Sequence, residues 1–242
     1  MEHYSQVFAV GDIHGCKNLL DNIHNQIIKI SQKKNGKKLI VYIGDYIDRG
    51  PDVKGTIQAL IDFQPDNFTK VFLLGNHEQM LLEFIDESRN SPYVWISNGG
   101  LETFTSYGQE LANYIDDSMH LSLNKKIRNK FIKYIPKSHM KFFKSLRLNY
   151  IWKDYLFVHA GINPDIPLDK QEKETMIWTR EKHFFKPTMT FSKIVVHGHT
   201  PNEKVENFPY RINLDTGSFY SGKLSCLIIQ DEKIEFIDSL NN

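Results

Sequence analysis

Five short segments of this chain join glycine to aspartate, asparagine or histidine. They are Gly-Asp-Ile-His-Gly at 11–15, Gly-Asp-Tyr-Ile-Asp-Arg-Gly at 44–50, Gly-Asn-His-Glu at 75–78, Val-His-Ala-Gly at 158–161 and His-Gly-His-Thr at 197–200. Carboxylate, amide and imidazole ligands with few thiols nearby suit hard or borderline divalent cations. Two such ions held close together can clamp a phosphate group and turn water into a nucleophile. The segments therefore predict a two-metal phosphoesterase.

The spacing within the segments divides the ligands between two ions. Asp12 and His14 lie two residues apart, so in extended backbone their side chains point the same way and can share one metal. Asp45 offers two carboxylate oxygens and could bridge both ions. Asn76 supplies a neutral oxygen in the equivalent place on the next strand. The second ion would be completed by His159 and by one histidine of the pair 197 and 199, a choice that spacing leaves open.

Each aspartate or asparagine in these segments could instead be an ordinary turn or cap residue. Gly-Asp and Gly-Asn are common loop dipeptides, so each position taken singly favours that structural interpretation. Five segments in this order, most of them just after an apolar run, support one another, and together they favour metal binding.

The apolar runs before these segments predict the strands that position them. We expect strands at 6–10, 39–43 and 71–74, and helices at 16–31, from Pro51 onward, and at 77–86. This β-α-β-α-β order implies an α/β fold with right-handed crossovers and a site at the carboxyl ends of neighbouring strands. Further strands are expected at 156–158, 194–196, 211–214, 224–229 and 233–237, the last two forming a hairpin around 230–232. Between about 90 and 147 we expect a mostly helical insert, with a break at Gly99-Gly100.

The composition is that of an ordinary globular protein. The 242 residues include 40% hydrophobic and 24% charged residues, and we expect a single domain over residues 1–242. The net charge of +1 argues neither for nor against nucleic acid, and we expect no nucleic-acid or membrane partner. Two cysteines are too few for a disulfide framework, no secretory signal is visible, and no apolar run reaches the length of a membrane span. A cytoplasmic protein is therefore expected.

The order of the five segments resembles that of the calcineurin-like metallophosphoesterases. It is most similar to their serine/threonine protein phosphatase branch, particularly the small bacterial and phage-type members. Other stretches look like the same branch: Asn98-Gly99-Gly100 followed by Thr103, Ser106-Tyr107-Gly108, Ile177-Trp178-Thr179-Arg180 and Leu214-Asp215-Thr216-Gly217. The resemblance extends from about residue 6 to 237. It implies a four-layer α/β/β/α sandwich of two mixed sheets, with the helices outside and the insert added to it.

The resemblance also implies a set of metal ligands. One ion would be held by Asp12, His14 and Asp45, and the other by Asp45, Asn76, His159 and His199. The histidine of the family's Gly-His-Thr falls on His199, which leaves His197 in a supporting or phosphate-facing place. Manganese is the expected metal, and iron and zinc fit the same ligands.

The same resemblance implies how the reaction runs. Arg49 and Arg180 would hold the phosphate, because guanidinium matches phosphate oxygens in a bidentate way. His77, oriented by Asp48, would protonate the leaving alkoxide, while a metal-bridging hydroxide attacks directly without a phosphoenzyme. Simpler interpretations remain open: His77 could only support the metals, Arg49 could only pair with Asp48, and Arg180 could lie in a packed surface loop.

These assignments predict hydrolysis of a phosphomonoester, with phosphoserine or phosphothreonine in proteins as the substrate and phosphotyrosine as a further one. The chief alternative is a diadenosine-tetraphosphate hydrolase, which shares the fold and the metal motifs; the pair Asp48 and Arg49, with Arg180, favours the monoesterase. A non-catalytic phosphate-binding or scaffold protein would have lost ligands, and every expected ligand is present. The aromatic residues of the insert, Trp95 among them, are expected to form its core.

Overall fold

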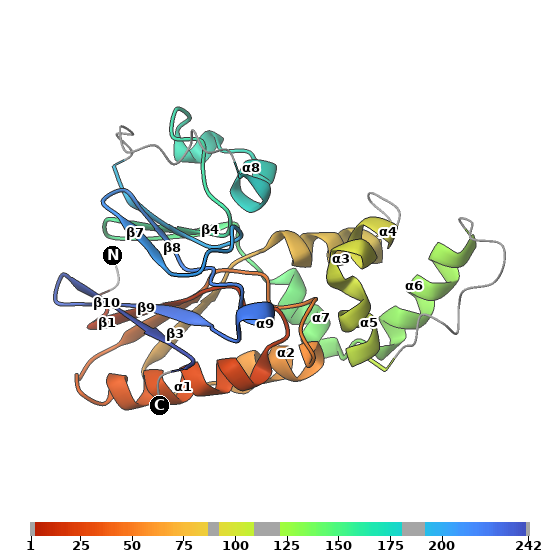
Figure 1. Ribbon diagram of the computed structural model, residues 1–242, viewed down its shortest axis with the longest axis horizontal. Coiled ribbons are helices and arrows are strands. Elements are labelled where there is room, and N and C mark those ends of the chain that lie inside the picture. Colours follow the sequence, from red (N-terminus) through yellow and green to blue (C-terminus); the bar gives the residue numbers. More distant parts are fainter. Residues whose placement is uncertain (1–2, 87–91, 109–121, 181–191, 241–242) are drawn as a thin grey trace.

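Two five-stranded β-sheets pack face to face in the computed structural model, which describes residues 3–86, 92–108, 122–180 and 192–240 (Figure 1). The first sheet has the strand order β10-β9-β1-β2-β3. Its strands are β1 (Gln6–Val10), β2 (Lys38–Tyr42), β3 (Phe68–Phe72), β9 (Ser225–Gln230) and β10 (Lys233–Asp238). The first three are parallel, and β9 and β10 form the expected antiparallel hairpin. The carboxyl ends of β1, β2 and β3 therefore lie at one edge.

The second sheet has the order β4-β5-β6-β8-β7. Its strands are β4 (Asn149–Trp152), β5 (Tyr155–Val158), β6 (Ile194–His197), β7 (Glu206–Phe208) and β8 (Arg211–Asn213). The inner strands β5, β6 and β8 are parallel, and the outer strands β4 and β7 are antiparallel to their neighbours. Both sheets are mixed, as expected.

Alternating side chains of the first sheet pack into two separate hydrophobic cores. Phe8 and Val10 of β1 face α1 (Lys17–Ser31) and α2 (Val53–Asp62) on the outer side. Val7 and Ala9 face inward, against residues of the second sheet such as Phe157. A third core covers the far side of the second sheet, beneath α8 (Lys173–Trp178). The layer order, helix, sheet, sheet, helix, confirms the predicted α/β/β/α sandwich (Figure 1).

The start of α2 differs from the expectation that Pro51 opens the helix. The helix begins at Val53, because the side chain of Asp52 accepts a hydrogen bond from the backbone N–H of Gly55 at 2.8 Å and so acts as its N-cap.

The predicted helical insert lies beside the first sheet and its helices (Figure 1). After α3 (Asn76–Asp86) it contains α4 (Pro92–Trp95), a π-helical turn (Ile96–Gly100), α5 (Leu101–Ser106), α6 (Ser122–Tyr134) and α7 (Lys137–Lys144). Residues 90–91 and 109–121 of the expected insert fall outside the described residues. The expected break occurs at Gly99, whose φ is 101°. Short helices also occur at Leu168–Lys170 and at α9 (Ser218–Ser221), and no helix in the described parts could span a membrane.

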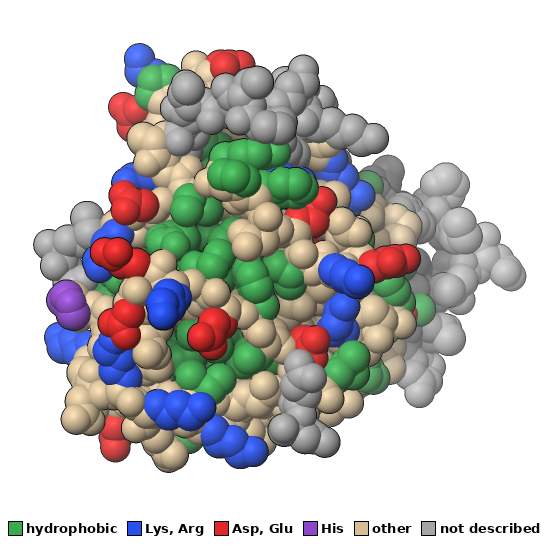
Figure 2. All heavy atoms as spheres, turned by 60° about the vertical axis from the view of Figure 1, so that its left-hand side comes forward, with side chains coloured by type: hydrophobic (Ala, Val, Ile, Leu, Met, Phe, Trp, Pro, Cys, Tyr) green, Lys and Arg blue, Asp and Glu red, His purple; other side chains and the backbone are tan. Residues whose placement is uncertain are grey.

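The sheets part around a hollow of about 600 Å³ at the end of the sandwich where β5 and β6 begin. Tyr155 and Ile194 line it together with Tyr4 and Trp152. Figure 2 looks toward this end and shows apolar side chains gathered in the middle of the face among charged ones. The predicted ligands follow the carboxyl ends of the strands, so they lie at the opposite end of the sandwich.

Candidate metal centre

The six predicted metal ligands share one position, because each follows shortly after a parallel strand. They are Asp12 and His14 after β1, Asp45 after β2, Asn76 after β3, His159 after β5 and His199 after β6. Backbone hydrogen bonds tie the loops together: His14 N donates to Asp45 O at 2.9 Å, and Gly198 N donates to His159 O at 2.8 Å. The two sheets thus present their ligand loops to one another.

Backbone strain is concentrated in these loops. His14, Asp45, Asp48, Arg49 and His199 have φ values between 46° and 69°, a region that residues with a Cβ rarely adopt. Strain of this kind persists only where the surrounding structure enforces it, and it is common at functional sites. The loops therefore fix the directions of these side chains, at a cost in conformational free energy.

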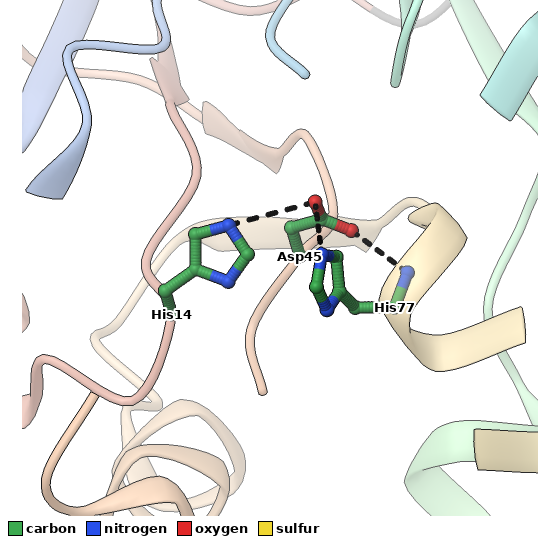
Figure 3. A group of neighbouring side chains, drawn as sticks. All are labelled: His14, Asp45 and His77. Atoms are coloured by element: carbon green, nitrogen blue, oxygen red, sulfur yellow. Dashed lines mark hydrogen bonds and ion pairs between the residues drawn. The ribbon is translucent and has the colours of Figure 1, made fainter. Parts of the chain in front are cut away.

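Asp45 lies at the centre of the site. Its Oδ2 is 3.6 Å from His14 Nε2 and 3.9 Å from His77 Nε2, and its Oδ1 is 3.3 Å from His159 Nε2. His14, from the loop after β1, and His77, from the start of α3, both direct their rings at this carboxylate (Figure 3). The backbone N–H of His77 also donates to Asp45 Oδ1 at 3.1 Å. The two carboxylate oxygens of Asp45 therefore face different histidines, an arrangement in which each oxygen could contact a separate ion.

Two groups of buried side chains could each hold a metal ion, and Asp45 belongs to both. One group is His14, Asp45 and His77, and the other is Asp45, His159 and His199; within each, the ligand atoms lie within 4.8 Å of one another. The second group matches the prediction, and Asn76 joins it, with its Oδ1 at 3.0 Å from His159 Nε2 and 2.9 Å from His199 Nδ1. In the first group, His77 stands where Asp12 was expected.

Asp12 nevertheless reaches the site. Its Oδ2 accepts a hydrogen bond from the backbone N–H of His199 at 2.9 Å, and its Oδ1 is buried without a hydrogen-bond partner among the described residues. A Cβ added at Gly198 would overlap this oxygen, so glycine is needed for the approach. A buried, unpaired carboxylate oxygen is costly unless a cation satisfies it, which fits the predicted ligand role.

Two backbone carbonyls fix the orientation of two of the predicted ligand histidines, His14 and His159. Ile47 O lies 2.9 Å from His14 Nδ1, and Ile43 O lies 3.0 Å from His159 Nδ1. Because a carbonyl can only accept, Nδ1 of each ring is the donor to it, and Nε2 is the nitrogen directed at Asp45. Metal-binding histidines commonly have such a partner on the other ring nitrogen.

The electrostatics of the site separate His77 from the other histidines. Burial, and then neighbouring positive groups, lower the pKa of His14 to about 3; burial and His159 lower that of His199 to about 2. Burial also acts to lower the pKa of His77, but Asp45 and the hydrogen bond to Asp48 outweigh it and raise that pKa. His14 and His199 are thus kept neutral, as metal ligands must be, while the raised pKa of His77 favours its protonated form.

Two guanidinium groups flank the ligands. Arg49 Nη1 lies 3.1 Å from His14 Nε2, and its guanidinium carbon is 5.1 Å from the ring centre of Phe219. Arg180 Nε donates to His199 Nε2 at 3.1 Å, and its Nη2 donates to His199 O at 3.2 Å. Each arginine therefore stands beside a histidine of a different ligand group, so an anion between the groups would meet positive charge from both directions.

Comparison with known proteins agrees with this geometry. The family model for calcineurin-like phosphoesterases (Metallophos) matches residues 5–233. The chain belongs to this family. Its members use divalent metal ions to hydrolyse phosphoesters, and the two buried His/Asp groups give this member side chains that could bind them.

The relatives of this calcineurin-like phosphoesterase carry two kinds of name. Serine/threonine-protein phosphatase 2 of Escherichia coli (strain K12) is 28% identical over 228 residues, covering 92% of both chains. An asymmetrical bis(5'-nucleosyl)-tetraphosphatase, PrpE of Oceanobacillus iheyensis, is 26% identical over 241 residues, covering 91% of this chain and 87% of its own. Among solved structures, a putative diadenosine tetraphosphatase superposes with a TM-score of 0.66 at 21% identity, covering 98% and 95% of the two chains. The last similarity shows the fold alone.

The insert of this phosphoesterase completes a hydrogen-bond network that the sequence did not reveal. Asp48 is fully buried, and its Oδ2 lies 2.6 Å from His77 Nδ1. Trp95 Nε1, from α4, donates to both Asp48 oxygens at 3.1 Å, and Thr103 Oγ1, from α5, donates to Oδ1 at 2.5 Å. Trp95 lies in the core of the insert, as expected, but its indole N–H also fixes the carboxylate that holds His77.

Glu78 is the second feature that the sequence did not reveal. This fully buried carboxylate accepts backbone N–H groups from Asp45 at 2.9 Å and Gly75 at 3.2 Å on Oε2, and from Tyr46 at 2.8 Å and Ile47 at 3.2 Å on Oε1. Burial, and then Asp45, raise its pKa to about 7. A glutamate in the first turn of α3 is an ordinary helix-start signal, and only the tertiary contact shows that it fastens the Asp45 loop.

His197 lies apart from the ligand groups. Its Nδ1 is 3.0 Å from Gly198 O, and its Nε2 is 3.4 Å from Arg211 Nη1. Asp215 forms a turn, in which its Oδ1 accepts the backbone N–H of Gly217 at 2.9 Å. Ser218 then donates to the carbonyls of Asp12 at 2.8 Å and Ile13 at 3.0 Å, so this turn and α9 support the loop that carries Asp12.

Proposed function

We propose that this phosphoesterase is a two-metal phosphomonoester hydrolase that acts on phosphoserine and phosphothreonine in proteins, with phosphotyrosine as a further substrate. The observation that carries the proposal is the single buried carboxylate, Asp45, shared by two ligand groups with an arginine beside each. A phosphomonoester carries its negative charge on one terminal phosphate, which suits a compact site of this kind.

One ion would be held by Asp12, His14 and Asp45, and the other by Asp45, Asn76, His159 and His199. When bound, the two ions would supply an activated water and neutralise charge on the phosphate. Manganese is the metal that we propose, and iron and zinc suit the same ligands. The sharing of Asp45 would couple the two sites, so loss of its charge would weaken both.

The chain's own residues would bind the phosphate and supply a proton. Arg49 and Arg180 would each offer paired N–H groups to phosphate oxygens. His77 would donate from Nε2 to the leaving oxygen, because Asp48 engages Nδ1 and the pKa of the ring is raised. A raised pKa also argues against His77 as a metal ligand, since a ligand nitrogen must give up its proton.

Hydrolysis of diadenosine tetraphosphate is the second candidate function. It is favoured by the names of the PrpE relatives, which are nearly as similar to this chain as the protein phosphatases. The metal ligands serve both reactions equally. The phosphatase is favoured by the positions of Arg49 and Arg180, one on each side of the ligands, where they would enclose a single terminal phosphate.

Turnover with manganese, measured as phosphate released from a peptide and as mononucleotides formed from a dinucleotide, distinguishes the two candidates. A phosphothreonine peptide and diadenosine tetraphosphate are supplied at equal concentration to the same preparation, with the Asp45→Asn variant as the blank. We expect the peptide to be hydrolysed faster. Faster cleavage of the dinucleotide would reject the protein phosphatase in favour of the nucleotide hydrolase. No turnover of either, with two ions bound, would reject both substrates.

A further inference from the structure

Charge is distributed very unevenly along this nearly neutral chain. The protein has 30 Lys and Arg residues against 29 Asp and Glu residues. Between Asp117 and Asp154, however, there is no acidic residue at all, while ten of the 30 basic residues lie there. This stretch forms α6, α7 and β4. The net charge of +1 therefore conceals a strongly basic segment offset by acidic residues elsewhere.

Most of the described basic side chains in this segment are exposed, although Arg128 of α6 is buried. Phe131 of α6, and Phe142 and Phe143 of α7, are buried in the core against the outer side of the first sheet. Five of the exposed cations lie between Lys130 and Lys153, and we call them the basic arm: Lys133, Lys137, Lys141, Lys144 and Arg147. The three lysines of α7 are spaced i, i+4 and i+7, so they form one row along the helix. In Figure 1, α6 and α7 lie on the opposite side of the molecule from α8.

The basic arm is not neutralised by the described parts of the chain. No ion pair or side-chain hydrogen bond joins any of its five members to a described residue. Like charges held close together on a surface repel one another and attract polyanions, particularly at low ionic strength. A partner with closely spaced negative charges would relieve this repulsion.

The composition of the basic arm distinguishes three kinds of partner: a membrane surface, a protein and a nucleic acid. A bilayer would need exposed apolar side chains to enter it, but the apolar faces of α6 and α7 are buried, and among their described residues Tyr134 is the exposed large hydrophobic one. Protein interfaces are depleted in lysine and have an apolar centre, which this surface lacks. Exposed Ser138 lies between Lys137 and Lys141, and hydroxyl groups of this kind commonly donate to phosphate oxygens of nucleic acids.

We propose that the basic arm binds the phosphodiester backbone of a nucleic acid without reading its sequence. The net charge of +1 argued neither for nor against a nucleic-acid partner, whereas the segregation of charge along the chain favours one. Lysine contacts to phosphate carry no sequence information by themselves. The proposal does not depend on which phosphoester the metal centre hydrolyses, because no member of the arm is a proposed site residue.

Salt-dependent binding tests this proposal directly. The intact protein is titrated into a fluorescent duplex DNA, and into the matching RNA duplex, at salt concentrations between about 50 and 200 mM. Both duplexes have hydroxyl ends, so they offer the metal centre no phosphomonoester. With five phosphate contacts, the logarithm of the binding constant should fall against the logarithm of salt concentration with a slope of about −4 to −5 for duplex DNA. A slope near −1 would contradict the proposal.

A matched pair of triple variants locates the surface. K137Q/K141Q/K144Q removes three arm lysines, and glutamine keeps a similar helix propensity. K29Q/K33Q/K204Q removes three exposed lysines outside the arm and changes the net charge equally. We expect the arm variant to bind at least about tenfold more weakly, with a slope reduced by about 3, and to keep its phosphatase activity. The control variant should bind as the unmodified protein does.

Two results would overturn the proposal. One is the absence of binding to both duplexes, and the other is an equal loss of binding in the two triple variants. If neither duplex binds, binding to phosphatidylserine vesicles would assign the arm to a membrane surface. A difference between DNA and RNA would identify the source of the phosphodiester and would support the proposal in either direction.

Discussion

Replacing His77 with asparagine should slow the release of poor leaving groups far more than that of good ones. His77 is 1% exposed, and its Nδ1 lies 2.6 Å from the buried Asp48 carboxylate, so bulk water has little access to replace its proton. An alkoxide leaving from phosphothreonine needs that proton, whereas a nitrophenolate leaves without it. The ratio of the two rates therefore isolates proton donation from metal binding.

The expected magnitude follows from the role assigned to His77. General acid catalysis contributes about 10²- to 10⁴-fold to a rate. We expect kcat for a phosphothreonine peptide to fall by about 10²-fold or more, which is roughly 2.7 kcal/mol of transition-state stabilisation. The loss on nitrophenyl phosphate should be smaller by at least about tenfold, because only the remaining electrostatic effect of the ring is removed.

The assay measures both substrates and the metal content of each preparation. His24→Gln is the matched control, because His24 is also a buried histidine but stacks on Phe63, with ring centres 3.7 Å apart, outside the metal centre. It should keep both activities. An equal loss on the two substrates, with both ions still bound to His77→Asn, would refute proton donation. Loss of an ion would instead assign His77 to the ligand group that it forms with His14 and Asp45.

Three further substitutions test the site and the fold. Asp45→Asn removes the carboxylate charge common to both ligand groups, so activity should be abolished and metal content, measured by atomic emission, should fall for both ions. Glu78→Gln replaces a carboxylate that accepts four backbone N–H groups with a side chain that has only one acceptor oxygen; the free energy of unfolding, from denaturant titration, should fall by about 3 kcal/mol. Burial, and then Lys70, lower the pKa of His24 to about 3 in the folded protein, against 6.5 when exposed. As the pH falls, His24 is therefore protonated in the unfolded chain before it is protonated in the folded protein, and the stability that its neutral form contributes above pH 6.5 is lost as the pH falls towards 3. Between pH 7 and 5, the free energy of unfolding of the unmodified protein should fall by about 2 kcal/mol more than that of His24→Gln. Parallel curves for the two proteins would contradict the assigned pKa.

The strands β1 and β2, which precede Asp12, His14 and Asp45, were predictable because they are central and buried on both faces. All five residues of β1 and of β2 are buried, so each reads as a continuous apolar run that stops at a Gly-Asp pair. Parallel strands of this kind bring the residues after them to the same edge. Sequence was therefore sufficient to bring His14 and Asp45 to one edge, where their side chains lie 3.6 Å apart, although a helix separates them in the chain.

Edge strands were predicted less well, for a physical reason. β4 and β7 lie at the two edges of the second sheet, and both were missed. β3, at the edge of the first sheet, was expected at 71–74 but spans Phe68–Phe72. Edge strands are only partly covered, so polar and exposed residues interrupt the apolar pattern, as in Glu206–Phe208, where none of the three residues is buried.

The insert was the least interpretable part of the sequence, yet it is coupled to the proposed chemistry. Its Trp95 and Thr103 hold Asp48, and Gly99 O accepts the backbone N–H of Arg49 at 3.0 Å. A Cβ at Gly99 would lie 2.6 Å from Arg49 Cγ, in a backbone conformation that already disfavours other residues. The proposed acid and one proposed phosphate ligand thus depend on contacts to residues about 50 positions further along the chain. Local patterns cannot reveal such partners, because the same tryptophan and threonine would fill an ordinary helical core equally well. The insert is therefore part of the site itself. Substitutions within it should reduce proton donation and phosphate binding even where the two sheets remain folded.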